Sequence, residues 1–251
     1  MLEIRNISKN FGGLEAVSDC TLTVKENSIT GLIGPNGAGK TTLFNVIANV
    51  FPPSAGEVVF LGEKLSGLPT WKVPAKGIAR TFQTPHGFPL LTVMESLMAT
   101  PLNQRGEKIV PAFIRGSRVR AQEEAAREKA HELLRSIGML DRRNELVINL
   151  SAGEARLVEM ARQLMLDPKV LLLDEPAAGI NPALRDNLVE LLKGLRTQGL
   201  TILVIDHNLG FIMDICDYIY VLARGRVIAE GSPKEISQNP TVIEAYVGKS
   251  A

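Results

Sequence analysis

The sequence contains few residues of the kinds that form disulfides or metal clusters. It has 2 cysteines, Cys20 and Cys216, and 3 histidines among 251 residues. The two cysteines lie far apart and lack the spacing of a metal site. We therefore expect two buried thiols in a reducing compartment.

The net charge is also close to zero, and long apolar runs are missing from the sequence. The formal net charge is +1, so the chain has no global basic field that would attract nucleic acid or an anionic membrane surface. Apolar runs such as Val170–Leu173 and Ile202–Ile205 are far shorter than the roughly 20 residues that span a bilayer. The N-terminus has no basic segment followed by an apolar stretch, so we expect no signal peptide and a cytoplasmic protein.

The patterns before residue 150 predict a β layer and then a helical lobe. Residues 2–33 and Glu57–Leu61 alternate short β-rich runs with turns, which predicts a mixed β layer. In the charged segment Ala121–Ile137, apolar residues gather on one side, and Gly138 follows it. This pattern predicts an amphipathic helix that ends at the glycine.

Strand-like and helix-like runs alternate after the lobe. Val170–Leu173 and Thr201–Ile205 predict buried strands, and Pro182–Arg196 predicts a helix with Asn181 as its N-cap. Such alternation predicts an α/β fold, with a parallel sheet and helices on both of its faces. We expect a single domain over residues 1–251, with a core of residues 1–85 and 155–251 and a helical subdomain of residues 86–154.

Gly34–Thr41 has the phosphate-loop pattern GxxxxGK[ST], placed between a β-like run, Ser28–Ile33, and a helix-like run, Thr42–Val50. The glycines let backbone N–H groups point inward around phosphates, and the helix offers its positive end. Lys40 can then reach the β- and γ-phosphates, and the Thr41 hydroxyl can complete a Mg²⁺ site. A glycine-rich turn is the alternative for this loop taken alone.

Polar side chains follow two of the predicted strands. Asp174 and Glu175 end one apolar run, and His207 follows the next. Ligands bind at the C-terminal ends of parallel strands, where the phosphate loop also lies. Asp174 can therefore hold Mg²⁺ through its water shell, Glu175 can polarise an attacking water, and His207 can hydrogen-bond the γ-phosphate. Without the phosphate loop, each would be read as a surface polar residue.

Ser151 and Glu154 form a predicted capping box at the start of the helix Ala155–Leu166. The same geometry makes an anion site, because Ala152 and Gly153 leave the backbone accessible and the helix dipole favours negative charge. These residues alone do not say whose phosphate would bind there.

Taken together and in this order, the motifs resemble those of the ATP-binding-cassette ATPases over nearly the whole chain. This resemblance implies a P-loop NTPase core with a parallel sheet, an N-terminal antiparallel β subdomain and an inserted α-helical subdomain. Phe11 matches the family's adenine-stacking aromatic residue, for which a buried phenylalanine of the β layer is the alternative. Asn181 stands where most members have an aspartate. The matches are Gly34–Thr41 with Walker A, Gln83 with the lid-loop glutamine, Leu150–Glu154 with the signature motif, Val170–Glu175 with Walker B and His207 with the switch histidine.

The resemblance implies an ATP hydrolase that works as a pair. Two domains face each other head to tail, and each ATP lies between one subunit's Walker A motif and the other's signature motif. The implied catalytic residues are Glu175, His207 and Gln83, and the implied Mg²⁺ residues are Thr41, Gln83 and Asp174. The implied ATP-binding residues are Phe11, Gly34, Asn36, Gly37, Ala38, Gly39, Lys40, Thr41, Thr42, Ser151, Ala152, Gly153 and Glu154.

Three phrases resemble the ATPase subunits of importers for branched-chain and other hydrophobic amino acids: Arg80-Thr-Phe-Gln83, Asp174–Pro182 and Asn239–Gly248. This resemblance implies integral membrane permease subunits as partners, a solute-binding protein acting indirectly, and a homodimer or a paralogous ATPase subunit at the inner face of the cell membrane. A urea importer subunit would share much of it. A soluble ATPase acting on nucleic acid or ribosomes is less favoured, because the chain has one cassette and nearly zero net charge.

The signature motif departs from the usual one at Ala152 and Glu154, where most members have Gly and Gln. Ala152 is a mild change. Glu154 places negative charge near a polyphosphate. Two negative unit charges about 4 Å apart repel each other by roughly 4 kcal/mol at an effective dielectric of about 20. We expect a smaller penalty if Glu154 points back into the helix cap or contacts a cation, for which Arg156 is one candidate.

Overall fold

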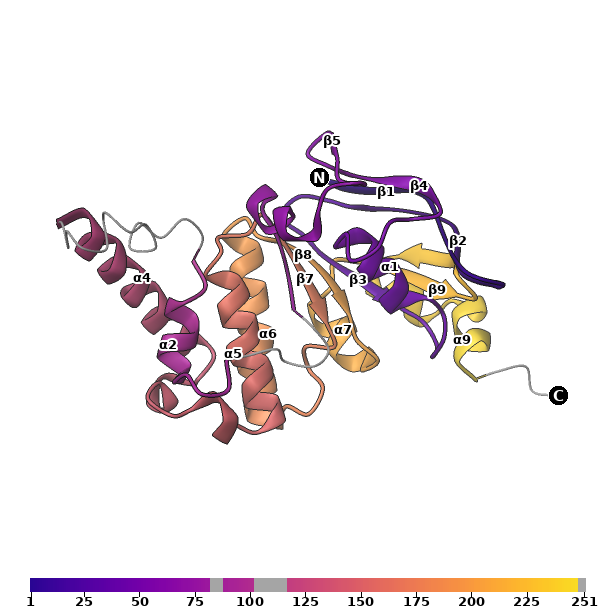
Figure 1. Ribbon diagram of the computed structural model, residues 1–251. Helices are drawn as coiled ribbons and strands as arrows, with labels where there is room; N and C mark the ends of the chain where they lie inside the picture. Colours follow the sequence, from indigo (N-terminus) through magenta and orange to yellow (C-terminus); the bar gives the residue numbers. More distant parts are fainter. Residues whose placement is uncertain (82–87, 102–116, 248–251) are drawn as a thin grey trace.

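The computed structural model describes residues 1–81, 88–101 and 117–247, and its first sheet is the predicted antiparallel layer. The strand order in this sheet is β2-β1-β4-β5, and every neighbouring pair is antiparallel. Figure 1 shows the sheet at the opposite end of the molecule from helices α2 and α4. Its strands are β1 (Leu2–Phe11), β2 (Leu14–Val24), β4 (Ala55–Phe60) and β5 (Glu63–Lys64).

The second sheet carries the predicted parallel strands. Its order is β10-β9-β3-β8-β7-β6, and all neighbouring pairs are parallel except β10 and β9. Parallel neighbours bring the C-terminal ends of β3, β7 and β8 to one edge, where the polar motifs begin. The strands are β3 (Ile29–Ile33), β6 (Ile78–Arg80), β7 (Val170–Asp174), β8 (Thr201–Ile205), β9 (Tyr218–Ala223) and β10 (Arg226–Gly231).

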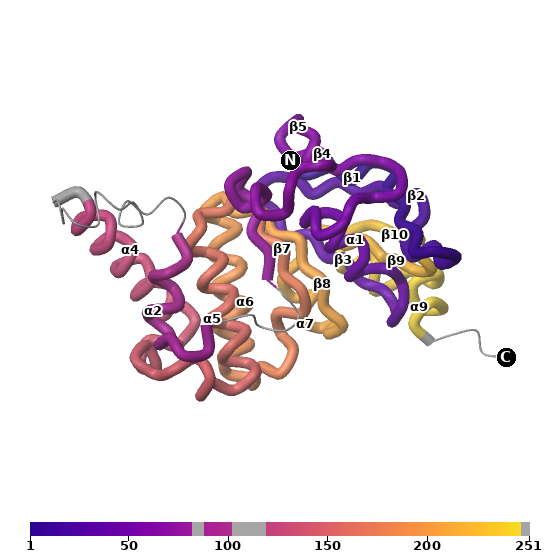
Figure 2. The backbone as a smooth tube through the Cα atoms, viewed as in Figure 1, coloured from indigo at the N-terminus to yellow at the C-terminus, as the bar shows by residue number. Residues whose placement is uncertain are grey.

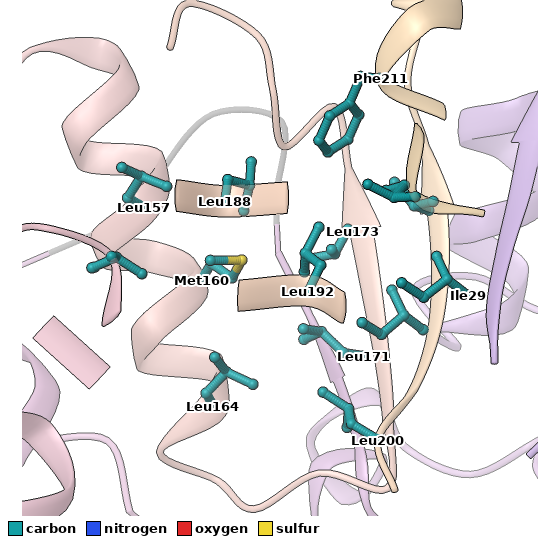
Figure 3. Packing of buried hydrophobic residues seen from close by; sticks show 14 of the residues in the cluster. Ile29, Leu157, Met160, Leu164, Leu171, Leu173, Leu188, Leu192, Leu200 and Phe211 are labelled. Atoms are coloured by element: carbon teal, nitrogen blue, oxygen red, sulfur yellow. The ribbon is translucent and has the colours of Figure 1, made fainter. Parts of the chain in front are cut away.

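Successive side chains of the parallel strands enter two different cores. Leu171 and Leu173 pack with α5 (Ala152–Leu164), α6 (Pro182–Thr197) and α7 (Leu209–Ile215), as Figure 3 shows for this cluster. Leu172 packs on the other face, with α1 and the antiparallel sheet. Helix α1 (Lys40–Ile47) therefore lies on one face of the parallel sheet, and α5 lies on the opposite face.

The helices α2 (Val93–Met98) and α4 (Ser117–Ser136) pack against each other and against α5. Figure 2 shows α2 and α4 at one end of the molecule. Helix α4 begins four residues before the predicted start, at Ser117 instead of Ala121, and Gly138 follows its end with a φ of 70°. Short helices α8 (Pro233–Ser237) and α9 (Pro240–Val247) follow β10.

Two expectations about the whole chain concern the thiols and the membrane. Cys20 and Cys216 are free and buried, as expected. Within residues 1–81, 88–101 and 117–247, none of the helices has the length and apolar character needed to span a bilayer.

Candidate nucleotide site

The phosphate loop joins β3 to α1, and its first and last glycines are required by close backbone neighbours. A Cβ on Gly34 would lie 2.0 Å from the Leu222 carbonyl oxygen, and one on Gly39 would lie 2.3 Å from the Ala16 carbonyl oxygen. Gly39 also has a φ of 100°, a conformation that side chains other than glycine rarely adopt. The surrounding fold thus fixes both ends of the loop.

Lys40 is folded back into this loop. Its Nζ donates hydrogen bonds to the carbonyl oxygens of Gly34, at 2.7 Å, and Pro35, at 2.9 Å. Burial lowers the pKa of Lys40, while the negative charges of Glu175 and Asp174 oppose that shift. The structure therefore brings the loop lysine close to both predicted carboxylates.

The other loop residues differ in their access to a ligand. Asn36, Gly37 and Thr41 are exposed, Thr42 is partly buried, and Ala38 is buried. The described residues include no group of three or more His, Cys, Asp or Glu side chains able to hold a metal. A Mg²⁺ ion that keeps several waters and binds phosphate oxygens needs only one or two protein oxygens, so the Thr41 hydroxyl and the Asp174 carboxylate fit it.

Asp174 is the last residue of β7, and only 3% of its side chain is exposed. Its backbone N–H donates to the Thr81 Oγ1 at 3.2 Å, and its Oδ2 lies 3.3 Å from Arg80 Nη2. Burial raises the pKa of Asp174, and the positive charge of Arg80 opposes that shift. The carboxylate is thus buried and paired at the end of its strand.

Glu175 follows in a left-handed conformation, with a φ of 51°. Its backbone N–H donates to the Ile205 carbonyl oxygen at 2.8 Å, and its own carbonyl oxygen accepts from Arg156 Nη1 at 2.7 Å. Its carboxylate Oε1 lies 3.7 Å from His207 Nδ1. The structure therefore brings Glu175 and the exposed His207 together from the ends of neighbouring strands. Such strain in a non-glycine residue is typical of functional positions.

Asp206 is a buried residue that connects the loops carrying Glu175 and His207. It is buried, and its carboxylate accepts backbone hydrogen bonds from Ala177 at 3.1 Å and from Asn208 at 2.9 Å. One side chain therefore holds the loop after Glu175 and the loop that contains His207.

The predicted capping box at Ser151 is present, and it explains how Glu154 is accommodated. Glu154 Oε2 accepts from the Ser151 backbone N–H at 2.9 Å and from its hydroxyl at 2.7 Å, so the carboxylate points back into the cap. The hydrogen bond from the Ser151 hydroxyl is the largest influence lowering the pKa of Glu154. Ser151 and Ala152 themselves are exposed, and Gly153 is buried.

Glu154 also has a cationic partner, but Arg156 was the wrong candidate. Arg142 Nε lies 3.4 Å from Glu154 Oε1. Arg156 instead reaches the Glu175 carbonyl, because it lies on the side of α5 that packs toward β7. Both conditions expected to reduce the charge penalty of Glu154 are therefore met.

Two further predicted residues have different outcomes. Gln83 lies outside the described residues. Phe11 is 46% exposed, so the alternative of a buried core phenylalanine is wrong. Its ring packs edge-on against Phe51, at 5.3 Å between centroids, and Lys9 Nζ lies 5.1 Å from its centroid. An aromatic surface therefore remains accessible.

The structure adds three residues that sequence reasoning did not select. They are Arg80, which pairs with Asp174; Arg142, which pairs with Glu154; and Tyr246, whose pKa is raised by burial and lowered by the Gly34 backbone. Arg80 and Tyr246 lie in phrases that carry the family resemblance, and their residue types alone indicate no site. Arg142 gave no sequence signal, because charged residues are common in that segment.

Comparison with known proteins identifies the family of this chain. The family model described as "ABC transporter" matches residues 17–178. The chain belongs to the ABC transporter family. A second model, "Branched-chain amino acid ATP-binding cassette transporter", matches residues 226–251. The protein is therefore an ABC-type ATPase with the expected P-loop fold.

The similarity to known proteins extends over essentially the whole length of the ATPase. It is 37% identical to the high-affinity branched-chain amino acid transport ATP-binding protein BraF of Pseudomonas aeruginosa, over 100% of this chain and 98% of the relative. It is 36% identical to the lipopolysaccharide export system ATP-binding protein LptB of Haemophilus influenzae, over 99% and 98%. A crystal structure of an ATP-binding cassette in its ADP conformation matches with a TM-score of 0.82 and 32% identity, over 99% of both chains.

Proposed function

We propose that this ATPase binds MgATP at the phosphate loop and powers the import of branched-chain or other hydrophobic amino acids. The observation that carries the proposal is the meeting of Lys40, Asp174, Glu175 and His207 at one edge of the parallel sheet. The match of the C-terminal segment to a branched-chain amino acid transporter model supports the choice of solute class.

The chemistry follows from the positions of these groups. Lys40 binds the β- and γ-phosphates, and the Thr41 hydroxyl and the Asp174 carboxylate would hold a Mg²⁺ ion, which would neutralise phosphate charge. The Glu175 carboxylate polarises the attacking water, and His207 donates a hydrogen bond to the γ-phosphate as charge develops there. Gln83 belongs to the same proposed site as a further Mg²⁺ and water contact.

The signature residues act on the ATP of a second subunit. Ser151 begins a helix on the opposite face of the parallel sheet from α1, which begins with Lys40. The exposed Ser151 and Ala152 are accessible to a partner's phosphates. The partner is a second copy of this chain or a paralogue, and the pair is peripheral on the cytoplasmic face of the membrane.

The membrane permease binds the helical subdomain, residues 86–154. Among the described residues of this subdomain, four large apolar side chains are exposed. They lie on two segments that are joined by a hydrogen bond from the Ile148 N–H to the Pro89 carbonyl and by the bridge between Thr92 and Leu146. Exposed apolar residues gathered in this way are typical of protein interfaces. They are Phe88, Leu90, Leu146 and Ile148.

A different transported solute is the second candidate, favoured by the likeness to LptB. The decisive experiment measures ATP hydrolysis and uptake of radiolabelled leucine in vesicles containing the ATPase and its co-expressed permease subunits. Glu175→Gln should retain ATP binding, lose most hydrolysis and abolish uptake, because the amide keeps the size but not the charge. Hydrolysis without leucine uptake would assign another solute, and parental hydrolysis in the variant would refute the role of Glu175.

A further inference from the structure

Arg80 joins the two halves of the candidate nucleotide site. It is the last residue of β6, and only 8% of its side chain is exposed. Its Nη1 donates to Asn45 Oδ1 on α1 at 2.7 Å, and its Nη2 donates to Asp174 Oδ2 on β7 at 3.3 Å. One guanidinium thus links the helix that follows the phosphate loop to the strand that ends in the candidate Mg²⁺ carboxylate.

Stability alone is a weak reason for burying this group. Burial lowers the pKa of Arg80, which reflects the cost of removing its charge from water. Apolar residues that replace a buried ion pair often leave a protein equally or more stable. The geometry gives a better reason, because the planar fork of arginine can hold two acceptors in fixed directions.

The backbone of Asp174 is held by other groups. Its N–H donates to Thr81 Oγ1 at 3.2 Å, and β7 is paired with β8 up to the contact of Asp174 with Ile205. What Arg80 adds is control of the carboxylate itself, through one of its two oxygens. Carboxylates that bind metals are commonly oriented by hydrogen bonds of this kind.

We propose that Arg80 is a positioning residue that holds Asp174 Oδ2, so that Oδ1 faces the Mg²⁺ of bound ATP. The inference rests on the proposed MgATP site. Asn45 anchors the other end of the guanidinium to α1, so the metal carboxylate and the phosphate-loop helix keep one relative position. Arg80 itself touches neither the nucleotide nor the reacting atoms.

The test measures the dissociation constant of ATP with Mg²⁺ and with EDTA, using the full chain. The ratio of the two constants gives the gain in affinity that the metal supplies. Arg80→Met should reduce this gain by about 10- to 100-fold, the usual cost of removing an outer partner of a metal ligand. Affinity in EDTA should stay near the parental value, because Lys40 and the loop backbone still bind the phosphates.

Arg162→Met is the matched control. Arg162 also forms a buried ion pair, with 11% of its side chain exposed and Nη1 2.5 Å from Glu159 Oε2, but that pair lies within α5. The Arg162→Met variant should therefore keep the parental gain in ATP affinity from Mg²⁺. Arg80→Lys keeps the charge but not the planar fork, so it should recover only part of the gain.

A parental or increased gain in Arg80→Met would overturn the inference. If Arg80→Met does not fold, Asn45→Ala decides, because it removes one anchor of the guanidinium and leaves the pair with Asp174. The gain should then fall in the same direction but by less, and an unchanged gain would refute the positioning role. A parental protein that binds ATP equally with and without Mg²⁺ would refute the proposed function itself.

Discussion

Arg142→Ala should weaken ATP-driven pairing of subunits by exposing the charge of Glu154. Arg142 Nε lies 3.4 Å from the Glu154 carboxylate, which belongs to the motif that is proposed to face a partner's γ-phosphate. Without the arginine, the carboxylate would meet that phosphate as an uncompensated like charge. The bare interaction of two unit charges about 4 Å apart is roughly 4 kcal/mol at an effective dielectric of about 20.

Solvent reduces that figure considerably. The side chains of Arg142 and Glu154 are 42% and 16% exposed, so water and salt screen the pair. Exposed pairs typically contribute about 0.2 to 1 kcal/mol. We use the upper part of this range, from about 0.5 kcal/mol, because only 16% of the Glu154 side chain is exposed. We therefore expect a decrease of roughly two- to fivefold in the association constant, using the conversion of 1.4 kcal/mol for each factor of ten.

The assay is sedimentation equilibrium with MgATP in a Glu175→Gln background, in which ATP persists. In a second series that also carries Glu154→Gln, Arg142→Ala should no longer weaken association, because no carboxylate remains to be compensated. Glu154→Gln alone keeps the cap and frees the arginine, so it should strengthen association slightly. Glu145→Gln is the control, because it removes only the other partner of Arg142, at 3.2 Å.

Two results would refute this reasoning. An equal loss on Arg142→Ala with and without the Glu154 charge would mean that Arg142 itself meets the phosphate. A large loss on Glu154→Gln would mean that the carboxylate is needed in its charged form. Both outcomes are separable from failure of the capping box, because loss of the cap would lower thermal stability without ATP.

Lys40→Ala should abolish or severely weaken ATP binding, whereas His207→Ala should leave the dissociation constant of ATP unchanged and lower kcat. Equal losses of ATP affinity in the two variants would contradict these separate roles. Phe11→Ala should weaken ATP by about 1 to 3 kcal/mol without changing affinity for inorganic triphosphate. An unchanged ATP affinity would remove the ring from the adenine site. Gly153→Ala should destabilise the fold by about 1 to 3 kcal/mol in urea unfolding, because the new Cβ would lie 2.5 Å from the Gly179 carbonyl oxygen. Ala152→Gly, at an exposed neighbour, is its control, and equal stability of the two variants would contradict the predicted clash.

Local features of the fold were predictable from short spacings. The capping box at Ser151, the N-cap at Asn181 and the helix end before Gly138 depend on hydrogen bonds or backbone angles within a few residues. Their chemistry is complete within one turn of chain. Strand β8 also has the predicted bounds, Thr201–Ile205, because a short apolar run fits a strand buried on both faces.

The exposure of Phe11 was not predictable in the same way. Its strand has apolar residues that are buried, such as Leu2, Ile4 and Ile7, and periodicity alone does not show where burial ends. The contact with Phe51 depends on how the chain returns after α1, which brings Ser54 beside Asn10.

The sequence by itself determined the phosphate loop, the strand-end carboxylates and the family, because each depends on residue types at fixed short spacings. Only the tertiary structure decided which charges meet. Arg80 and Asp174 are 94 positions apart and meet because β6 lies beside β7 in the sheet. Arg142 and Glu154 meet because the chain before α5 returns to the start of that helix. Pairing between distant charges depends on strand order and chain return, which no local spacing encodes.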